Sequence, residues 1–121
     1  MSRKDPRYAL DRFTACRAWH LHRDFLSAAP SYILWGHGPT GRALRRELET
    51  LGHRPEAIVE VHPRRIGNEI HGAQVIPPSD LIDQPPLPII VSVAGAKPRD
   101  EIRGALRAME FSEGDQFVFA A

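Results

Sequence analysis

The sequence predicts a single α/β domain in which helices cover both faces of a parallel β-sheet. Short apolar runs alternate with amphipathic segments along the chain, which is the pattern of successive βα units. Residues 89–94 form an almost continuous β-branched run, as expected of a central strand that is buried on both sides. The length of 121 residues lies near the commonest size of one domain.

Ahead of the sheet, the sequence predicts a polar tail over residues 1–9 and a helix within residues 10–28. Helical spacing defines the buried face of this helix by four large apolar side chains: Leu10, Phe13, Leu21 and Phe25. Cys16 lies at the edge of that face and is predicted to be buried and inert. Trp19 is predicted to project away from it.

The βα core is predicted over residues 31–121. Strands are expected near residues 32–35, 57–61, 74–76, 89–94 and 116–119. Helices are expected near residues 39–51 and 98–110, with one helical turn over residues 80–83 and mostly loop over residues 62–72. Right-handed crossovers then give a sheet of four to five strands in the order 3-2-1-4-5. Ligands of such sheets bind where the strand order reverses, here between the first and fourth strands.

The helix over residues 39–51 carries a clear amphipathic pattern. Its buried stripe is formed by Leu44, Leu48 and Leu51. The charged side chains predicted to face outward are Arg42, Arg45, Arg46 and Glu49.

The first strand runs directly into Gly-His-Gly-Pro-Thr-Gly at residues 36–41, a G-x-G-x-x-G spacing. Between a strand and a helix, this spacing is typical of dinucleotide-type phosphate loops. Gly36 permits the tight turn, Gly38 lets the backbone approach a pyrophosphate, and Gly41 lets the helix pack against the strand. The pattern predicts a Rossmann-like three-layer fold and favours anion binding at the helix N-terminus. The alternative is that the glycines serve only to make a tight turn.

Three other residues of the loop are candidates for ligand contact. Pro39 removes one backbone donor, as in flavin-type loops of the form G-x-G-P-x-G, and Thr40 supplies a hydroxyl instead. His37 could touch a ligand, although a histidine at a loop tip is expected to be exposed to water.

Two charged residues outside the loop are further candidates. Glu60 lies 19 residues after Gly41, where an acid accepts hydrogen bonds from a ribose diol in Rossmann folds. The alternative is a carboxylate that pairs with Arg64 or Arg65, two cations that would equally suit a phosphate. Lys97, in the loop after the fourth strand, could clamp a phosphate or be simply exposed.

Composition limits the classes of function. Sixteen basic and fifteen acidic side chains give a net charge of +1, so no general attraction to nucleic acid or to an anionic membrane is expected. The single cysteine excludes an internal disulfide, and no apolar stretch approaches the ~20 residues of a membrane span. With no secretory leader visible, a cytoplasmic location is expected. The six histidines show no metal-ligand spacing, and no catalytic residues are predicted.

Three stretches together resemble a known module: Ile-Leu-Trp-Gly-His-Gly-Pro-Thr-Gly-Arg, Ile-Val-Glu-Val-His-Pro-Arg-Arg-Ile-Gly and His-Gly-Ala-Gln-Val-Ile-Pro-Pro-Ser-Asp-Leu. They are similar to the Rossmann-like accessory domain in the C-terminal region of bacterial family 2 glycosyltransferases. More distantly, they resemble the N-terminal, nucleotide-sugar-contacting domain of amino-sugar acetyltransferases. The first resemblance extends over almost the whole chain. Glu60 and His62 replace two aspartates of the module, and His37 stands where a small residue is usual.

The resemblance implies a non-catalytic module that binds a nucleotide or nucleotide-sugar and works with a glycosyltransferase catalytic domain. NAD(P) and UDP-sugars are the candidate ligands. One alternative is an interaction module with a degenerate site, in which Trp19 and the first helix face a partner. Another is a small NAD(P)-dependent oxidoreductase, for which a catalytic acid–base pair is missing. The residues expected at the ligand are Gly36, His37, Gly38, Pro39, Thr40, Gly41, Glu60 and Lys97.

Overall fold

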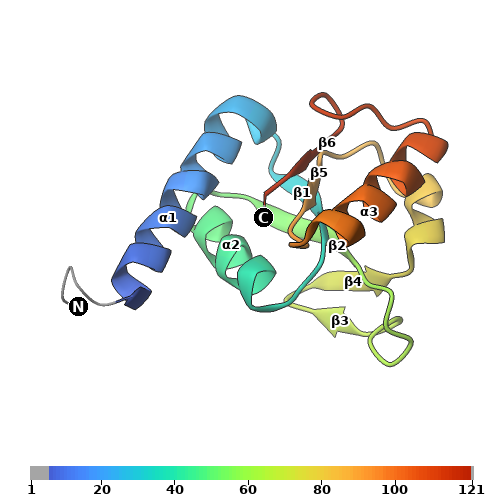
Figure 1. Ribbon diagram of the computed structural model, residues 1–121, viewed down its shortest axis with the longest axis horizontal. Coiled ribbons are helices and arrows are strands. Elements are labelled where there is room, and N and C mark those ends of the chain that lie inside the picture. The colour runs from blue at the N-terminus through green and yellow to red at the C-terminus, as the bar shows by residue number, and fades with distance from the viewer. Residues whose placement is uncertain (1–5, 121) are drawn as a thin grey trace.

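The computed structural model describes residues 6–120, with side chains from residue 11 onward, and it confirms the predicted α/β architecture. The strands are β1 (Ser31–Trp35), β2 (Arg54–Val59), β3 (Glu69–Ile70), β4 (Ala73–Ile76), β5 (Ile89–Val91) and β6 (Phe117–Phe119). The helical segments are α1 (Pro6–Leu21), η1 (His22–Leu26), α2 (Pro39–Thr50), η2 (Pro78–Asp83) and α3 (Ala96–Ala108). Figure 1 shows the sheet between its helices.

The sheet has the strand order β3-β4-β2-β1-β5-β6. The five parallel strands reproduce the predicted order 3-2-1-4-5, and the order reverses between β1 and β5. The sixth strand, β3, pairs antiparallel with β4 in a segment predicted to be mostly loop. His71 and Gly72 connect the two strands and both have positive φ, which two-residue hairpin turns of type I′ require.

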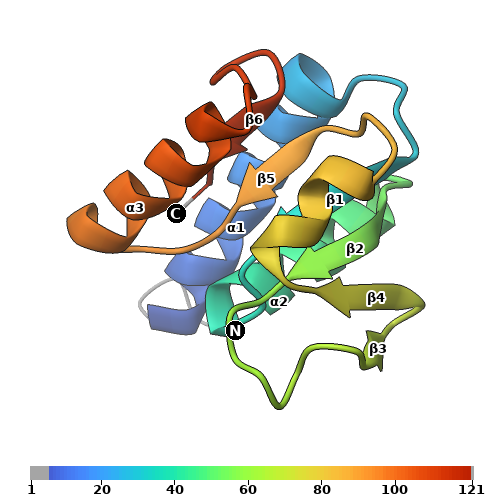
Figure 2. The ribbon, with the colours of Figure 1, turned by 90° about the vertical axis from the view of Figure 1, so that its right-hand side faces the viewer.

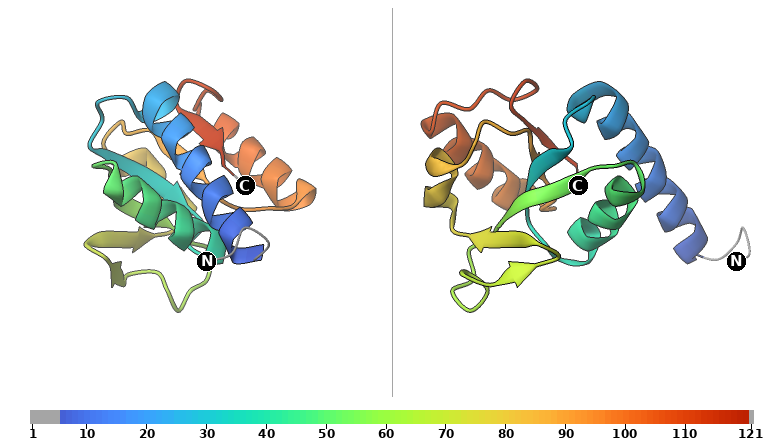
Figure 3. Two further views of the ribbon diagram at one scale, coloured as in Figure 1. Left: turned by 90° about the vertical axis from the view of Figure 1, so that its left-hand side faces the viewer. Right: turned by 180° about the vertical axis from the view of Figure 1, so that it is seen from behind.

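Helices cover both faces of the sheet. Because side chains alternate along a strand, Tyr32 and Leu34 point to one face while Ile33 and Trp35 point to the other. The first face is covered by α1 and α2, which lie side by side (Figure 3). The second face is covered by α3 and η2 (Figure 2). In the described part of the chain, no helix combines the length and the apolar character needed to cross a membrane.

The N-terminal helix differs from its prediction in extent. It begins at Pro6, so residues 6–9 are helical rather than tail, and the rest of the predicted tail lies outside the described residues. Proline is well suited to the first helical position, since its missing N–H has no intrahelical acceptor there. The last predicted turn forms the π-helical segment η1.

The predicted buried face of α1 is partly wrong. Phe13 is 59% exposed and Cys16 is also exposed, whereas Ala18 and Leu26 pack into the core. The apolar residues of α1 lie all around the helix, so periodicity could not single out the side that packs against α2 and the sheet. Trp19 is 49% exposed, in agreement with its prediction.

A pair of histidines joins the end of the N-terminal helix to the start of β2. His53 Nδ1 donates a hydrogen bond to the carbonyl oxygen of Ala29 at 2.6 Å. In neutral His53, Nε2 therefore accepts, and His22 Nδ1 lies 2.7 Å away as the donor. The ring of Trp19 lies 5.4 Å from that of His22. Sequence patterns predict no role for His53, which is buried.

We expect His53→Ala to lower the free energy of unfolding by about 2 kcal/mol, because it leaves the Ala29 carbonyl and the His22 ring without their buried partner. Urea unfolding followed by circular dichroism measures this loss. His20→Ala, at an exposed histidine of α1, should change stability by less than about 0.5 kcal/mol. Equal losses in the two variants would contradict a structural role for the histidine pair.

Candidate functional site

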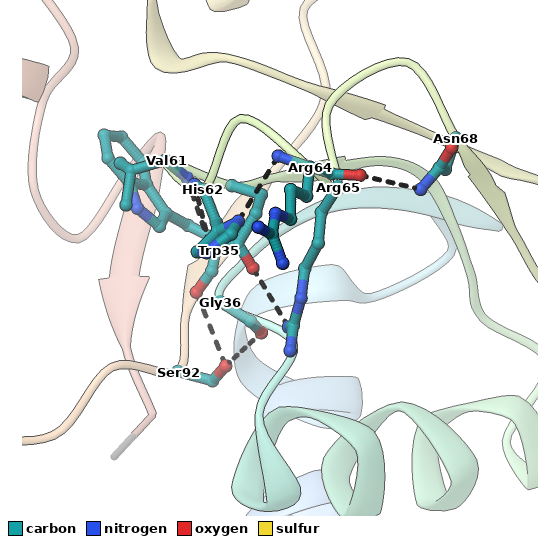
Figure 4. A network of polar contacts seen from close by, with 9 residues as sticks. Trp35, Gly36, Val61, His62, Arg64, Arg65, Asn68 and Ser92 are labelled. Carbon is teal, nitrogen blue, oxygen red and sulfur yellow. Dashed lines mark hydrogen bonds and ion pairs between the residues drawn. The ribbon is translucent and has the colours of Figure 1, made fainter.

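The turn between β1 and α2 depends on two glycines that lie in close contact with their neighbours. Gly36 has φ +101°, and a Cβ atom there would lie 2.8 Å from Val93 Cγ2. A Cβ atom at Gly41 would collide with the carbonyl oxygen of Gly36. Ser92 Oγ donates a hydrogen bond of 2.7 Å to that same oxygen, as Figure 4 shows. The first and third glycines of the motif are therefore needed to seat α2 against β1 and β5.

Gly38 has a different environment. Its backbone is extended, with φ −80° and ψ −167°, and a Cβ atom there would meet nothing within 4 Å. It is the N-cap of α2 and makes no side-chain capping bond, and Pro39 is the first residue of the helix. The amides of Thr40 and Gly41 lie in the first turn, where no intrahelical acceptor exists. This open N-terminus is the kind of site at which helices bind anions.

His37 is buried, contrary to the expectation of an exposed loop tip. The residue is 5% exposed, and its Nε2 atom has no hydrogen-bond partner within the described chain. Burial is the largest cause that lowers the pKa of His37 to about 4, and electrostatic interactions with Arg45, Arg42, His71 and Arg65 contribute to the same shift. The three arginines come from α2 and the loop after β2, and His71 comes from the β3–β4 turn.

Arg45 was predicted to face outward, and this prediction is wrong. The side chain is only 5% exposed, with Nη1 3.3 Å from Glu49 Oε2. Its Nε atom and the hydroxyl of neighbouring Tyr32 are buried without hydrogen-bond partners in the described part of the chain. Burial raises the pKa of the Tyr32 phenol, while Arg45 opposes that shift. Arg45 lies one turn after Gly41, on the side of α2 that packs inward.

Glu60 lies directly after β2 and already has protein partners. Its Oε1 accepts a hydrogen bond from the amide of Val61 at 3.0 Å, and its Oε2 lies 3.3 Å from Arg65 Nη1. The pairing with an arginine that the sequence left as an alternative is therefore observed. Figure 4 shows that Arg64 and Arg65 both extend toward the segment that leads into α2. Glu60 thus holds one of these cations near the glycine loop.

A crevice of about 200 Å³ opens at the carboxyl ends of the central strands, against α3. This is the position at which open α/β sheets bind their ligands. The lining residues are Trp35, Gly36, Val59, Glu60, Val61, Val93, Pro98, Glu101 and Ile102. Lys97 is exposed in the first turn of α3 and does not line the crevice, whereas Glu101, one turn later, does. The sequence singled out neither Glu101 nor Ser92.

Two larger hollows lie elsewhere. One of about 490 Å³ is lined by residues of the N-terminal helical segment, Gly114 and β6. Another of about 470 Å³ is lined by residues of α1 and of the C-terminal part of α2. Their walls include Phe13, Cys16 and Trp19 and no residue of the glycine loop. They are features of α1 rather than parts of the strand-end crevice. Within residues 11–120, no three His, Cys, Asp or Glu side chains come together as metal ligands.

Comparisons with known proteins bear on the fold. Searches against family models and against curated proteins give no match. Among solved structures, the chain is similar to one described as "Crystal structure of RSP in complex with beta-NADH", with a TM-score of 0.56 and 16% sequence identity. The similarity covers 74% of this chain and 51% of that one, so this chain spans about half the length of the solved chain. The shared fold is Rossmann-like.

The second and third glycines of the motif should respond differently to a methyl group. Gly41→Ala is expected to lower the free energy of unfolding by about 2–3 kcal/mol, since its Cβ atom would collide with backbone that cannot move independently. Gly38→Ala should lower it by less than about 1 kcal/mol, the difference between glycine and alanine as N-caps. Urea unfolding measures both. Equal losses would mean that Gly41 has no special packing role.

Burial of neutral His37 makes stability depend on pH. The pKa of His37 is about 4 in the folded chain, against about 6.5 when unfolded, so the unfolded state takes up the proton first. Stability should fall by roughly 2–3 kcal/mol as the pH decreases from 7 to 4. His37→Gln should remove that part of the decrease in urea unfolding at the two pH values. A decrease of the same size in both proteins would show that other groups cause it.

Proposed function

We propose that this chain is a non-catalytic module that binds a nucleotide containing a pyrophosphate, such as a dinucleotide or a nucleotide-sugar. The observation that carries the proposal is the geometry of the glycine loop. Gly36 and Gly41 are fixed by packing, whereas Gly38 is open and sits at an N-terminus without a side-chain cap. A phosphate can approach the backbone only where no side chain intervenes, and Gly38 meets that condition.

The charges around the loop favour the same class of ligand. Arg42, Arg45 and Arg65 are close enough to His37 to contribute to its lowered pKa, so their positive charges act beside the N-terminus of α2. Arg42 follows the three residues of the first turn, where a cation is unfavourable unless an anion is also present. In this proposal the pyrophosphate lies at the N-terminus of α2, and the nucleoside lies in the crevice beside Glu60. The similar solved structure is itself a complex with beta-NADH.

The association with a glycosyltransferase belongs to the same proposal and comes from the resemblance of the sequence to accessory domains of that class. In that setting, the ligand would be a nucleotide-sugar such as a UDP-sugar, and the catalytic domain would be the partner. Among the described residues, no group near the loop is arranged for acid–base catalysis: His37 is buried and favours its neutral form, and Glu60 is paired with Arg65. A hydride transfer or UDP-sugar hydrolysis that disappears in His37→Ala would instead favour an enzyme.

A protein-interaction module is the second candidate. The observation in its favour is the outer side of α1, where Phe13 and Trp19 are both about half exposed and border the two large hollows. Trp is among the residues most often found at the centre of protein interfaces. This reading requires no ligand at the glycine loop, so a nucleotide-binding measurement separates the two candidates.

Isothermal titration calorimetry with NADH, NADPH, UDP and a UDP-sugar tests the proposal. We expect at least one of these pyrophosphate compounds to bind, and Gly38→Val to weaken that binding at least tenfold by blocking the approach to the backbone. Gly104→Val is the matched control. It makes the same change at a glycine of α3 that is equally open and has no positive φ.

Two outcomes would contradict the proposal. No binding of any compound by a folded protein would favour the interaction module. Binding that Gly38→Val leaves unchanged would place the ligand away from the glycine loop. Circular dichroism confirms that both variants are folded before either outcome is interpreted.

A further inference from the structure

The hollow of about 490 Å³ beside the N-terminal helical segment plays no part in the proposed nucleotide site. Figure 3 shows α1 between α2 on one side and β6 on the other, and this hollow, the α1–β6 hollow, lies on the side toward β6. Phe13 is 59% exposed there, and Leu21 and Phe25 are only partly buried. A continuous apolar recess of this kind marks an interaction surface.

Two opposite charges lie along the α1–β6 hollow. Arg17 and Asp24 both line it, about two helical turns apart along the same side of the segment. The guanidinium of Arg17 lies 4.9 Å from the centre of the Phe13 ring, and its Nε atom is buried with no hydrogen-bond partner in the described part of the chain. Asp24 pairs with Arg23 at 2.8 Å, but both side chains are exposed, so this bond competes only weakly with another partner.

A surface with this arrangement of charge is complementary to a second copy of itself. In a two-fold contact, a residue of one copy meets a different residue of the other, and the reverse contact forms as well. If two α1 segments pack antiparallel about the midpoint between His20 and Leu21, Arg17 of each copy faces Asp24 of the other. A parallel two-fold arrangement would oppose Arg17 to Arg17 and Asp24 to Asp24, and like charges repel. Charge therefore selects the antiparallel arrangement.

The apolar residues of the hollow fit the same arrangement. Cys16 and Phe25 are equally distant from that midpoint, so each faces the other across the two-fold axis, and Leu21 lies beside the axis. We propose that this side of α1 and η1 is the interface of a symmetric homodimer, in which α1 of each copy fills the α1–β6 hollow of the other. The inference does not depend on the proposed function, since no residue of the glycine loop lines the hollow.

Analytical ultracentrifugation of the whole chain tests the inference through a charge exchange. We expect a reversible dimer with a micromolar Kd, which Arg17→Glu or Asp24→Arg alone raises about tenfold, because by symmetry each change turns two attractive pairs into repulsive ones. The double variant exchanges the charges and should return the Kd to within about threefold of the wild-type value. Arg46→Glu, at an exposed arginine of α2, is the matched control and should leave the Kd unchanged.

The two exposed aromatic residues of α1 identify the side of the helix that is used. Phe13→Ala should weaken the dimer because Phe13 lines the α1–β6 hollow. Trp19→Ala should leave the dimer unchanged because Trp19 lines the hollow toward α2 instead. Circular dichroism confirms that each variant is folded, and the exposed position of Asp24 keeps the charge test available if Arg17→Glu unfolds the chain.

Three outcomes would overturn the inference. A wild-type chain that stays monomeric up to about 200 μM would leave the hollow to a different protein. A dimer that neither single charge reversal weakens, or that the double variant fails to restore, would have its interface elsewhere or in another orientation. A dimer that Trp19→Ala weakens and Phe13→Ala does not would use the opposite side of α1.

Discussion

The site depends on one backbone contact, that between Gly41 in the first turn of α2 and the carbonyl of Gly36 at the end of β1. Only a residue without Cβ allows the helix to come this close. The buried hydroxyl of Ser92 binds the same carbonyl and connects β5 to the turn. This contact fixes how closely the first turn of α2 approaches the end of β1, and it thereby helps to set where the N-terminus of α2 lies.

The resulting site has an uneven distribution of charge. Arginine side chains from α2 and from the loop after β2 lie close enough to His37 to contribute to its lowered pKa. Carboxylates of Glu60 and Glu101 lie at the crevice against α3. In the proposed complex, a phosphate at the N-terminus of α2 and a nucleoside in the crevice would meet opposite fields, which would favour one orientation of the bound nucleotide over its reverse. Glu60 contributes to both regions, because it lines the crevice and also forms an ion pair with Arg65.

The sequence predicted the parts of this structure that local patterns encode. The glycine spacing, the β-branched run of β5 and the leucine stripe of α2 gave the fold, the strand order and the place of the turn. Prediction from the sequence failed for residues whose burial is determined by tertiary contacts. Arg45 looks like an outward cation on a helical wheel, yet it is buried beside Tyr32, and His37 is buried although a histidine at a loop tip is expected to be exposed. The exposure of Phe13 on α1 likewise depends on which side of that helix meets the sheet.

The central claim is that the open N-terminus of α2 binds a diphosphate. Nuclear magnetic resonance of ¹⁵N-labelled protein titrated with ADP tests it at the level of single amides. The account predicts that the largest shift changes occur at Gly38, Thr40 and Gly41, whose amides lie at or next to that N-terminus. Saturable shifts confined to α1, with these three resonances unmoved, would contradict it.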